Sequence, residues 1–332
     1  MEKLTRGLDQ KHLDNFKKSK WFEFYKEHKD ADKLFLGIRN NYINIYYKCM
    51  SIAKIQGTFT NAQIADEYSE KKYDSKTKQH SITYDKFITD YDKIKKRVEN
   101  HVNKPKANLR EKVTQAYMVY NNNINKKSNW VCIDIEYTKQ RKGKNDGDAS
   151  GRFDIIAVNK KNLRIALIEL KVDKGALGES NGVRKHAQDW NDFIENGLFY
   201  KSNKRLNRDD YLIREINDII NNKYTLDNEF PIKGCSEDKL KEIKPEFYFI
   251  ICGGKLSIEE IKNETRKYVW DKQKCQKYGI KRVGTRNVER ELGFDITENN
   301  KDRLFCNFLF AERYGEDIKD IIDDKNYEIR IK

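Results

Sequence analysis

Residues 152–172 read RFDIIAVNKKNLRIALIELKV, two apolar runs on either side of a polar turn. Two β-rich runs around a turn of Asn and Lys predict a β-hairpin. Because side chains alternate across a strand, Glu169 and Lys171 project from the same face of the second strand. That strand is otherwise apolar on both faces, as central strands are, and charged side chains are rarely placed there without a partner or a function.

A second acid, Asp154, lies on the first strand of this hairpin. Antiparallel pairing can bring Asp154 opposite the Glu169 end of the second strand. Two carboxylates and one lysine at one end of a sheet are suited to hold a divalent cation with a fixed positive charge beside it. We therefore predict a metal site formed by Asp154 and Glu169, with Lys171 next to it.

Asp154 followed by Glu169-Leu170-Lys171 resembles the motif of the PD-(D/E)xK nuclease superfamily, with Phe153 in the place of the family's proline. The neighbouring patterns have the order that this resemblance requires. Periodicity predicts a helix, a strand, the two hairpin strands, a helix and a strand. The ranges outside the hairpin are 108–121, 130–138, 182–196 and 246–254.

The resemblance covers residues 108–253 and implies an α/β fold, a restriction-endonuclease-like α-β-β-β-α-β core with a mixed central sheet. With 332 residues the chain has room for more than this core. We expect residues 1–104 to form an N-terminal α+β region for substrate or partner binding. The nuclease-like domain is expected over 105–332, with an insertion at about 200–244 and a C-terminal extension after 254.

The composition favours a folded protein with a polyanionic partner. Lys and Arg number 67 against 53 Asp and Glu, a formal net charge of +14, which favours nucleic acid. The six cysteines show no CxxC pair and no His at ligand spacing, so the sequence does not predict a zinc site. The start has no apolar leader and no run approaches the ~18 residues of a membrane span, so we expect a cytoplasmic protein without a membrane partner.

The resemblance implies that the protein hydrolyses phosphodiester bonds with Mg²⁺ as its cofactor, and that Mn²⁺ can substitute for Mg²⁺. Mg²⁺ suits the site because it takes one or two carboxylates and keeps several waters. We expect a DNA endonuclease of a restriction, phage-defence or repair type, acting as a homodimer or with a defence-system partner protein. The alternatives are a ribonuclease, or a nucleic-acid-binding or assembly module with the same fold and little or no catalysis.

Many members of this superfamily use a further acid, and two residues are candidates for it here. Glu111 lies near the start of the first core helix, the position that the resemblance favours. Glu136 lies at the end of the first core strand and stays open as the alternative. A first-turn acid favoured by the helix dipole is the ordinary interpretation of Glu111. The ordinary interpretation of Glu136, and of its neighbour Asp134, is a solvated residue at the edge of the sheet.

Basic residues that could bind nucleic acid lie on both sides of the hairpin. The glycine-containing loop 173–182 leads into the second core helix, where backbone N–H groups, Arg184 and Lys185 could hold a phosphate. Arg152, at the start of the hairpin, is a further candidate. His186 lies on the same helix, where a solvated polar face is its ordinary interpretation.

Overall fold

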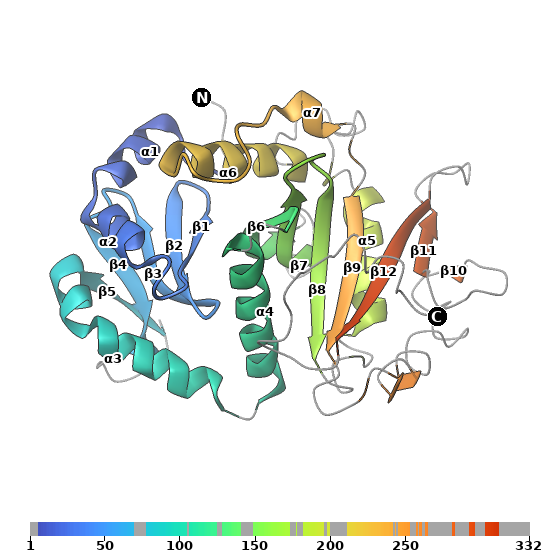
Figure 1. The fold of residues 1–332 in the computed structure, drawn as a ribbon, viewed down its shortest axis with the longest axis horizontal. Helices are drawn as coiled ribbons and strands as arrows, with labels where there is room; N and C mark the ends of the chain where they lie inside the picture. The colour runs from blue at the N-terminus through green and yellow to red at the C-terminus, as the bar shows by residue number, and fades with distance from the viewer. Residues whose placement is uncertain are drawn as a thin grey trace. The chain divides into compact units, whose positions relative to one another are not determined.

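The computed structural model divides the chain into two compact units (Figure 1). The first comprises Met1–Ala116 and Ile213–Leu240, and the second comprises Tyr117–Leu212 and Lys241–Lys332. The structure describes residues 6–69, 78–104, 106–124, 128–140, 149–172, 177, 182–195, 198–199, 211–241, 243, 245–252, 257, 259–260, 263–264, 281–282, 292–295 and 303–311. Most of the glycine-containing loop 173–182 therefore lies outside the described residues.

A five-stranded antiparallel sheet forms the centre of the first unit. Its strands are neighbours in chain order: β1 (Phe35–Ile38), β2 (Tyr42–Tyr47), β3 (Met50–Gln56), β4 (Asn61–Ala65) and β5 (Gln79–Thr83). Helices α1 (Gln10–Lys17), α2 (Lys20–His28) and α3 (Tyr84–Val102) accompany it, with a 3-10 turn η1 (Asp66–Tyr68). The first unit thus combines helices with an antiparallel sheet, and it extends beyond the expected range 1–104.

Alternating apolar residues and side-chain caps explain these elements. Isoleucines at every second position of β2 are fully buried, as an amphipathic strand requires. The N-cap residues of the three helices are Asp9, Ser19 and Thr83. The side chain of each accepts a hydrogen bond from a backbone N–H of the first turn. Aromatic rings of the helices fill the core under the sheet; they include Phe16, Trp21, Phe24, Phe87 and Tyr91.

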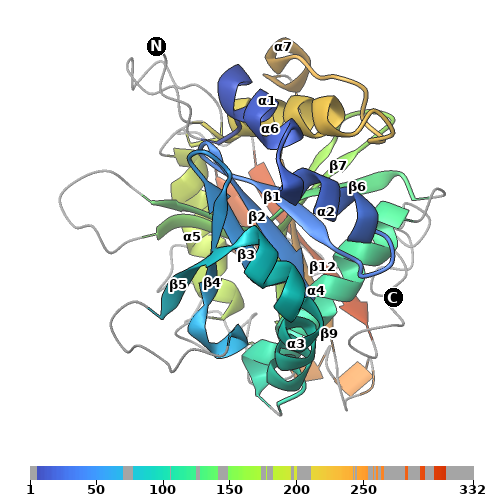
Figure 2. The same cartoon turned by 90° about the vertical axis from the view of Figure 1, so that its left-hand side faces the viewer.

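Two helices from far along the chain also belong to the first unit. They are α6 (Leu212–Leu226) and α7 (Glu237–Lys241), and α6 lies alongside α1 in both views (Figure 1, Figure 2). The Lys223 Nζ donates to the backbone oxygen of Leu36 over 2.6 Å. Asp227 forms an ion pair with Lys29, also at 2.6 Å. The described part of the expected insertion at 200–244 thus packs with the N-terminal region.

A mixed seven-stranded sheet forms the centre of the second unit. Its order is β10-β11-β12-β9-β8-β7-β6, and β9 runs parallel to both of its neighbours while the other pairs are antiparallel. The strands are β6 (Trp130–Gln140), β7 (Ala149–Asn159), β8 (Ile165–Val172), β9 (Pro245–Cys252), β10 (Lys281–Arg282), β11 (Leu292–Asp295) and β12 (Arg303–Ala311). The mixed α/β character of the prediction is confirmed.

Two further helices complete the expected succession of elements. α4 (Ala107–Ile124) precedes β6, and α5 (Val183–Glu195) follows β8. On α5, the Trp190 ring stacks on Phe247 at 4.8 Å and on Phe249 at 4.4 Å between centroids. Both phenylalanines belong to β9, so α5 covers one face of the sheet, and this face carries the candidate site.

The hairpin predicted over 152–172 is confirmed. β7 and β8 pair antiparallel, from Ile155 opposite Ile168 to Val158 opposite Ile165. Every residue of β8 is buried, as expected of a central strand. In the part of the chain that is described, no helix has both the length and the apolar character needed to cross a membrane.

Candidate functional site

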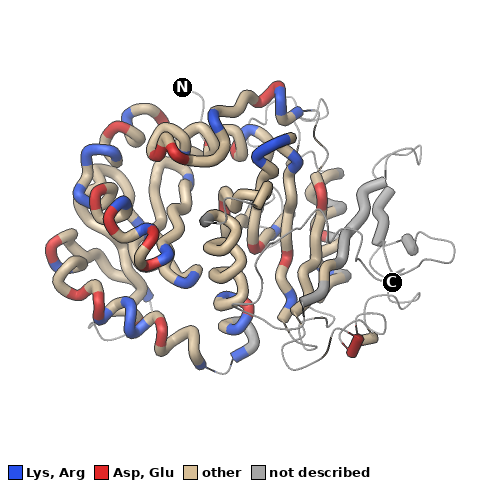
Figure 3. Tube along the Cα trace, in the orientation of Figure 1, with Lys and Arg blue, Asp and Glu red and all other residues tan. Residues whose placement is uncertain are grey.

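Glu169 and Lys171 lie at the end of β8 and form an ion pair. Figure 3 shows that the charged positions of β8 are confined to this end. Both residues are only 4% exposed, and Lys171 Nζ lies 2.5 Å from Glu169 Oε1. In the parallel register Glu169 pairs with Phe249, whose ring stacks on α5. Because registered residues of parallel strands share a face, the ion pair projects from the α5-covered face of the sheet.

Asp154 is held against the same strand segment. The paired part of the hairpin ends at Ile155 opposite Ile168, and Asp154 is the next residue of β7. The Asp154 Oδ2 accepts a hydrogen bond from the backbone N–H of Leu170 over 2.7 Å. This bond places the Asp154 carboxylate next to the backbone of the residue that follows Glu169.

Glu136 extends this arrangement onto a third strand. Glu136 lies on β6 between Ile135, which pairs with Ile155, and Tyr137, which pairs with Phe153. Glu136 is exposed, with φ +52°, a left-handed backbone conformation that is uncommon for a residue other than glycine. Such backbone outliers concentrate at functional sites, so the conformation motivates a functional hypothesis for Glu136.

The other acids considered from the sequence lie elsewhere. Asp134 is fully buried, and its Oδ1 accepts a hydrogen bond from the N–H of Ile135 over 2.9 Å. Its interpretation as a solvated edge residue is therefore wrong; Asp134 lies next to a register shift of β6 between Cys132 and Asp134. Glu111 lies on the part of α4 that belongs to the first unit, whereas the strand acids belong to the second.

His186 is a site residue that the sequence interpretation missed. It lies on α5 with 8% of its surface exposed, and its Nε2 is 3.0 Å from Glu169 Oε1. Its interpretation as a solvated residue is wrong. The signal was present in the sequence: His186 lies three residues after Val183 and four before Trp190, within the apolar stripe of the helix.

The charges around Glu169 favour its ionised form. Burial opposes ionisation, but Lys171 and His186 together outweigh it and hold the pKa of Glu169 below its ordinary value. Asp189, one turn further along α5, forms an ion pair with Lys185. Burial and the charge of Glu169 nevertheless raise the pKa of Asp189. The end of β8 and the adjoining turn of α5 therefore form a network of acids and bases that is largely shielded from water.

The predicted nucleic-acid contacts are placed on the same unit. Arg152 is an exposed residue of β7, and its backbone oxygen accepts a hydrogen bond from Trp190 Nε1 over 3.3 Å. Lys185 keeps 43% of its side chain exposed while it pairs with Asp189. Arg184 lies on α5, and its side chain is outside the described part of the structure.

The site can be compared with the needs of the expected cation. Within the described ranges, no group of three or more His, Cys, Asp or Glu side chains is arranged to hold a metal ion. Asp154 and Glu169 supply two carboxylates, and Mg²⁺ ordinarily takes one or two from a protein. Lys171 and His186 both contact Oε1 of Glu169, so Oε2 is the oxygen suited to a cation. In type and number these two donors fit Mg²⁺.

Comparisons of the chain with protein-family models, with curated proteins and with solved structures found no match. The chemistry of this site is therefore interpreted from its own residues. Three observations carry that interpretation: an ion pair at the end of a central strand, an acid bonded to the same strand, and a histidine from the covering helix.

Proposed function

We propose that this chain is a metal-dependent nuclease that hydrolyses phosphodiester bonds, with a restriction-endonuclease-like core formed by α4, β6, β7, β8, α5 and β9. The observation that carries the proposal is the buried ion pair of Glu169 and Lys171, with Asp154 bonded to the residue between them. The match of motif and element order to the PD-(D/E)xK pattern supports it.

Fold stability alone does not account for this ion pair. Removing two charges from water costs several kcal/mol per ion, and well-packed apolar residues of similar volume are often as stable or more so. The rest of β8 consists of Ile, Ala, Leu and Val. An apolar pair would continue this pattern, so we infer that Glu169 and Lys171 are retained for their chemistry.

The roles of the residues follow from their charges and positions. Asp154 and Glu169 would hold Mg²⁺, which when bound neutralises phosphate charge and lowers the pKa of a coordinated water. Lys171 would orient the attacking water and balance the negative charge that develops on the phosphate oxygens. As the further acid we favour Glu136 over Glu111, because Glu136 lies on β6, the strand that pairs with the strand of Asp154.

The preferred substrate is DNA, cut endonucleolytically as in restriction, phage defence or repair. The net charge of +14 supports a nucleic acid. Lys185 and Arg152 are the described basic residues of the site's surroundings that a phosphate could contact. RNA offers the same phosphodiester chemistry, so the experiment below compares both substrates.

The test is cleavage of plasmid DNA, single-stranded DNA and RNA with Mg²⁺ or Mn²⁺, and with EDTA as the metal-free arm. We expect nicked plasmid with either cation and none with EDTA. Lys171→Met should lower the rate by roughly 10²–10⁴-fold, the usual effect of removing a group that acts in proton transfer. Cleavage at the parent rate by Lys171→Met would refute the assignment of the site.

A second buried lysine offers a matched control. Lys223 is 8% exposed, donates to the Leu36 oxygen over 2.6 Å, and lies 4.4 Å from the centroid of the Phe35 ring. Lys223→Met should lower stability without changing the rate of the folded protein. Cleavage of RNA alone would indicate a ribonuclease. Binding of nucleic acid without cleavage by the parent would indicate the binding module.

A further inference from the structure

Glu169 is held by two donors that come from different elements. Lys171 approaches Oε1 from β8 itself, at 2.5 Å, and His186 approaches the same oxygen from α5, at 3.0 Å. The described residues direct no other hydrogen bond or ion pair to this carboxylate. Two donors on one oxygen fix the orientation of the carboxylate and keep Oε2 for another ligand.

The histidine is the more rigid of the two donors. A lysine side chain has a flexible four-carbon stem, whereas the imidazole ring turns about only two bonds. α5 is itself anchored by Trp190, which stacks on Phe247 and Phe249 and donates to the backbone oxygen of Arg152. His186 therefore connects Glu169 to a fixed part of the sheet's cover.

The contact does not depend on the charge of the ring. Nε2 carries a hydrogen both in the neutral Nε2–H tautomer and in the imidazolium, and in either form it donates to Glu169. Nδ1 is buried and has no hydrogen-bond partner among the described residues. The neutral tautomer leaves Nδ1 without a hydrogen and so avoids a buried, unsatisfied N–H. Among the described residues, the charged groups that interact with the ring include Glu169 on β8 and Asp189 on α5, whose ion-pair partners are Lys171 and Lys185.

We infer that His186 is a positioning residue for Glu169: it fixes Oε1 so that Oε2 faces the cation and the scissile phosphate. The inference rests on the proposed nuclease function. Catalytic carboxylates are effective only when a supporting set of contacts holds them within a fraction of an ångström of the productive geometry. In this site that support comes from α5.

Two substitutions separate the hydrogen bond from the volume of the ring. His186→Phe keeps an aromatic ring but has no donor, and His186→Gln places an amide N–H near the position of Nε2. We expect His186→Phe to lower kcat by about 10–100-fold, the usual effect of losing a partner of a metal ligand, with KM for plasmid unchanged. His186→Gln should restore most of the activity. His80→Phe is the matched control, because His80 pairs with Asp66 at 2.8 Å in the first unit, and it should leave kcat unchanged.

A second readout does not require activity. Nitrogen-15 NMR of the five histidines should show His186 protonated on Nε2, with a resonance that shifts in Glu169→Gln. A hydrogen on Nδ1 alone, or no response to Glu169→Gln, would overturn the inference. If the parent is active and His186→Phe has the same kcat as the parent, the inference about His186 is also overturned. The proposed nuclease function would stand in that case. A parent that cleaves no nucleic acid overturns the proposed function, and the role of His186 in that reaction with it.

Discussion

The carboxylate of Asp154 accepts a hydrogen bond from the backbone N–H of Leu170 over 2.7 Å. Leu170 separates Glu169 from Lys171, so this bond ties the acid of one strand to the ion pair of the next. It lies one residue beyond the regular pairing of β7 with β8, which ends at Ile155. A single carboxylate therefore both joins the two strands and, in the proposed reaction, binds the cation.

The two roles of Asp154 can be separated by substitution. Asn keeps an oxygen that can accept from the Leu170 N–H but lacks the negative charge that Mg²⁺ requires of its ligand. We expect Asp154→Asn to retain the folded structure and to lose cleavage by a factor of at least about 10², because several kcal/mol of charge stabilisation disappear. Plasmid nicking and circular dichroism of the same preparation measure the two effects.

Asp154→Ala removes the acceptor as well as the charge. Hydrogen bonds to charged groups contribute ~1.5–3 kcal/mol, so its free energy of unfolding should fall by about this amount, and further than that of Asp154→Asn. Urea unfolding of the two variants gives the comparison. Equal stabilities for Asn and Ala would show that the bond to Leu170 does not hold the strands together.

Much of the fold was predictable because it depends on local patterns. The alternation of Ile, Leu and Val around a polar turn defined the β7–β8 hairpin, and an all-apolar strand indicated its central place in the sheet. The neighbouring projection of Glu169 and Lys171 followed from the two-residue period of a strand and is confirmed. These features require no knowledge of distant residues.

What could not be predicted depends on contacts between distant segments. The burial of His186 requires α5 to lie over Glu169, and helical periodicity alone does not say what a stripe faces. The packing of α6 in the first unit depends on Lys223 and Asp227 meeting residues nearly 200 positions earlier. The left-handed backbone of Glu136 also had no signal in the sequence, since no glycine marks the position.

Asp218 on α6 gives a pH-dependent stability. Burial, with a smaller contribution from Glu237, raises its pKa to about 6 from an ordinary 3.8, although Arg214 acts in the opposite direction. A raised pKa in the folded state means that its stabilising contribution is complete below about pH 3.8 and is lost as pH rises through about 6. Asp218→Asn should therefore stabilise the protein at neutral pH and have no effect near pH 3.8.

Urea unfolding of parent and Asp218→Asn across this pH range measures the difference. Asp92→Asn is the control, because Asp92 is 94% exposed on α3 and lacks the burial that acts on Asp218. A stability gain from Asp218→Asn that stays constant from neutral to acid pH would contradict the proposed ionisation. A loss at neutral pH would contradict it as well.

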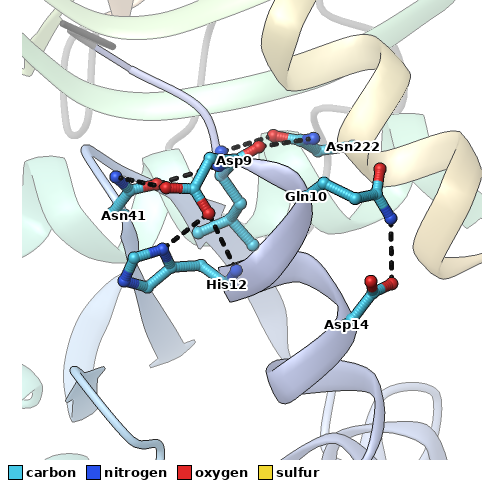
Figure 4. Close-up of polar contacts among 7 residues, drawn as sticks. Asp9, Gln10, His12, Asp14, Asn41 and Asn222 are labelled. Carbon is cyan, nitrogen blue, oxygen red and sulfur yellow. Dashed lines mark hydrogen bonds and ion pairs between the residues drawn. The ribbon is translucent and has the colours of Figure 1, made fainter. Parts of the chain in front are cut away.

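The backbone of Leu8 is held by the amide of Asn222 on α6. Its Oδ1 accepts from the Leu8 N–H over 2.6 Å and its Nδ2 donates to the Leu8 oxygen over 3.2 Å. Figure 4 shows these bonds beside those of Asp9, which accepts from His12 and from Asn41. Leu8 is 5% exposed, so loss of the amide leaves two buried backbone groups without these partners.

Asn222→Ala should lower the free energy of unfolding by about 1–3 kcal/mol, the penalty of an unsatisfied buried polar group. The amide of Leu8 should exchange its hydrogen faster, which hydrogen exchange measured by NMR detects. Thr225→Ala is the control on the same helix, because the exposed Thr225 hydroxyl donates to the Asn221 oxygen within its own helix. Unchanged exchange at Leu8 in Asn222→Ala would show that α6 does not hold this segment.

Lys185 should contribute to nucleic-acid affinity through its charge. It is the described lysine of α5, it keeps 43% of its side chain exposed, and its ion pair with Asp189 can be exchanged for a phosphate contact. Each phosphate contact releases about one counterion, so Lys185→Gln should weaken binding of all sequences alike and reduce the salt dependence of log K by roughly 0.9. Lys161→Gln is the control, because Lys161 is exposed in the turn of the β7–β8 hairpin, at the other end of β8 from Glu169. Equal salt dependence for Lys185→Gln and the parent would place the phosphate contacts elsewhere, since a lost contact must change the number of released ions.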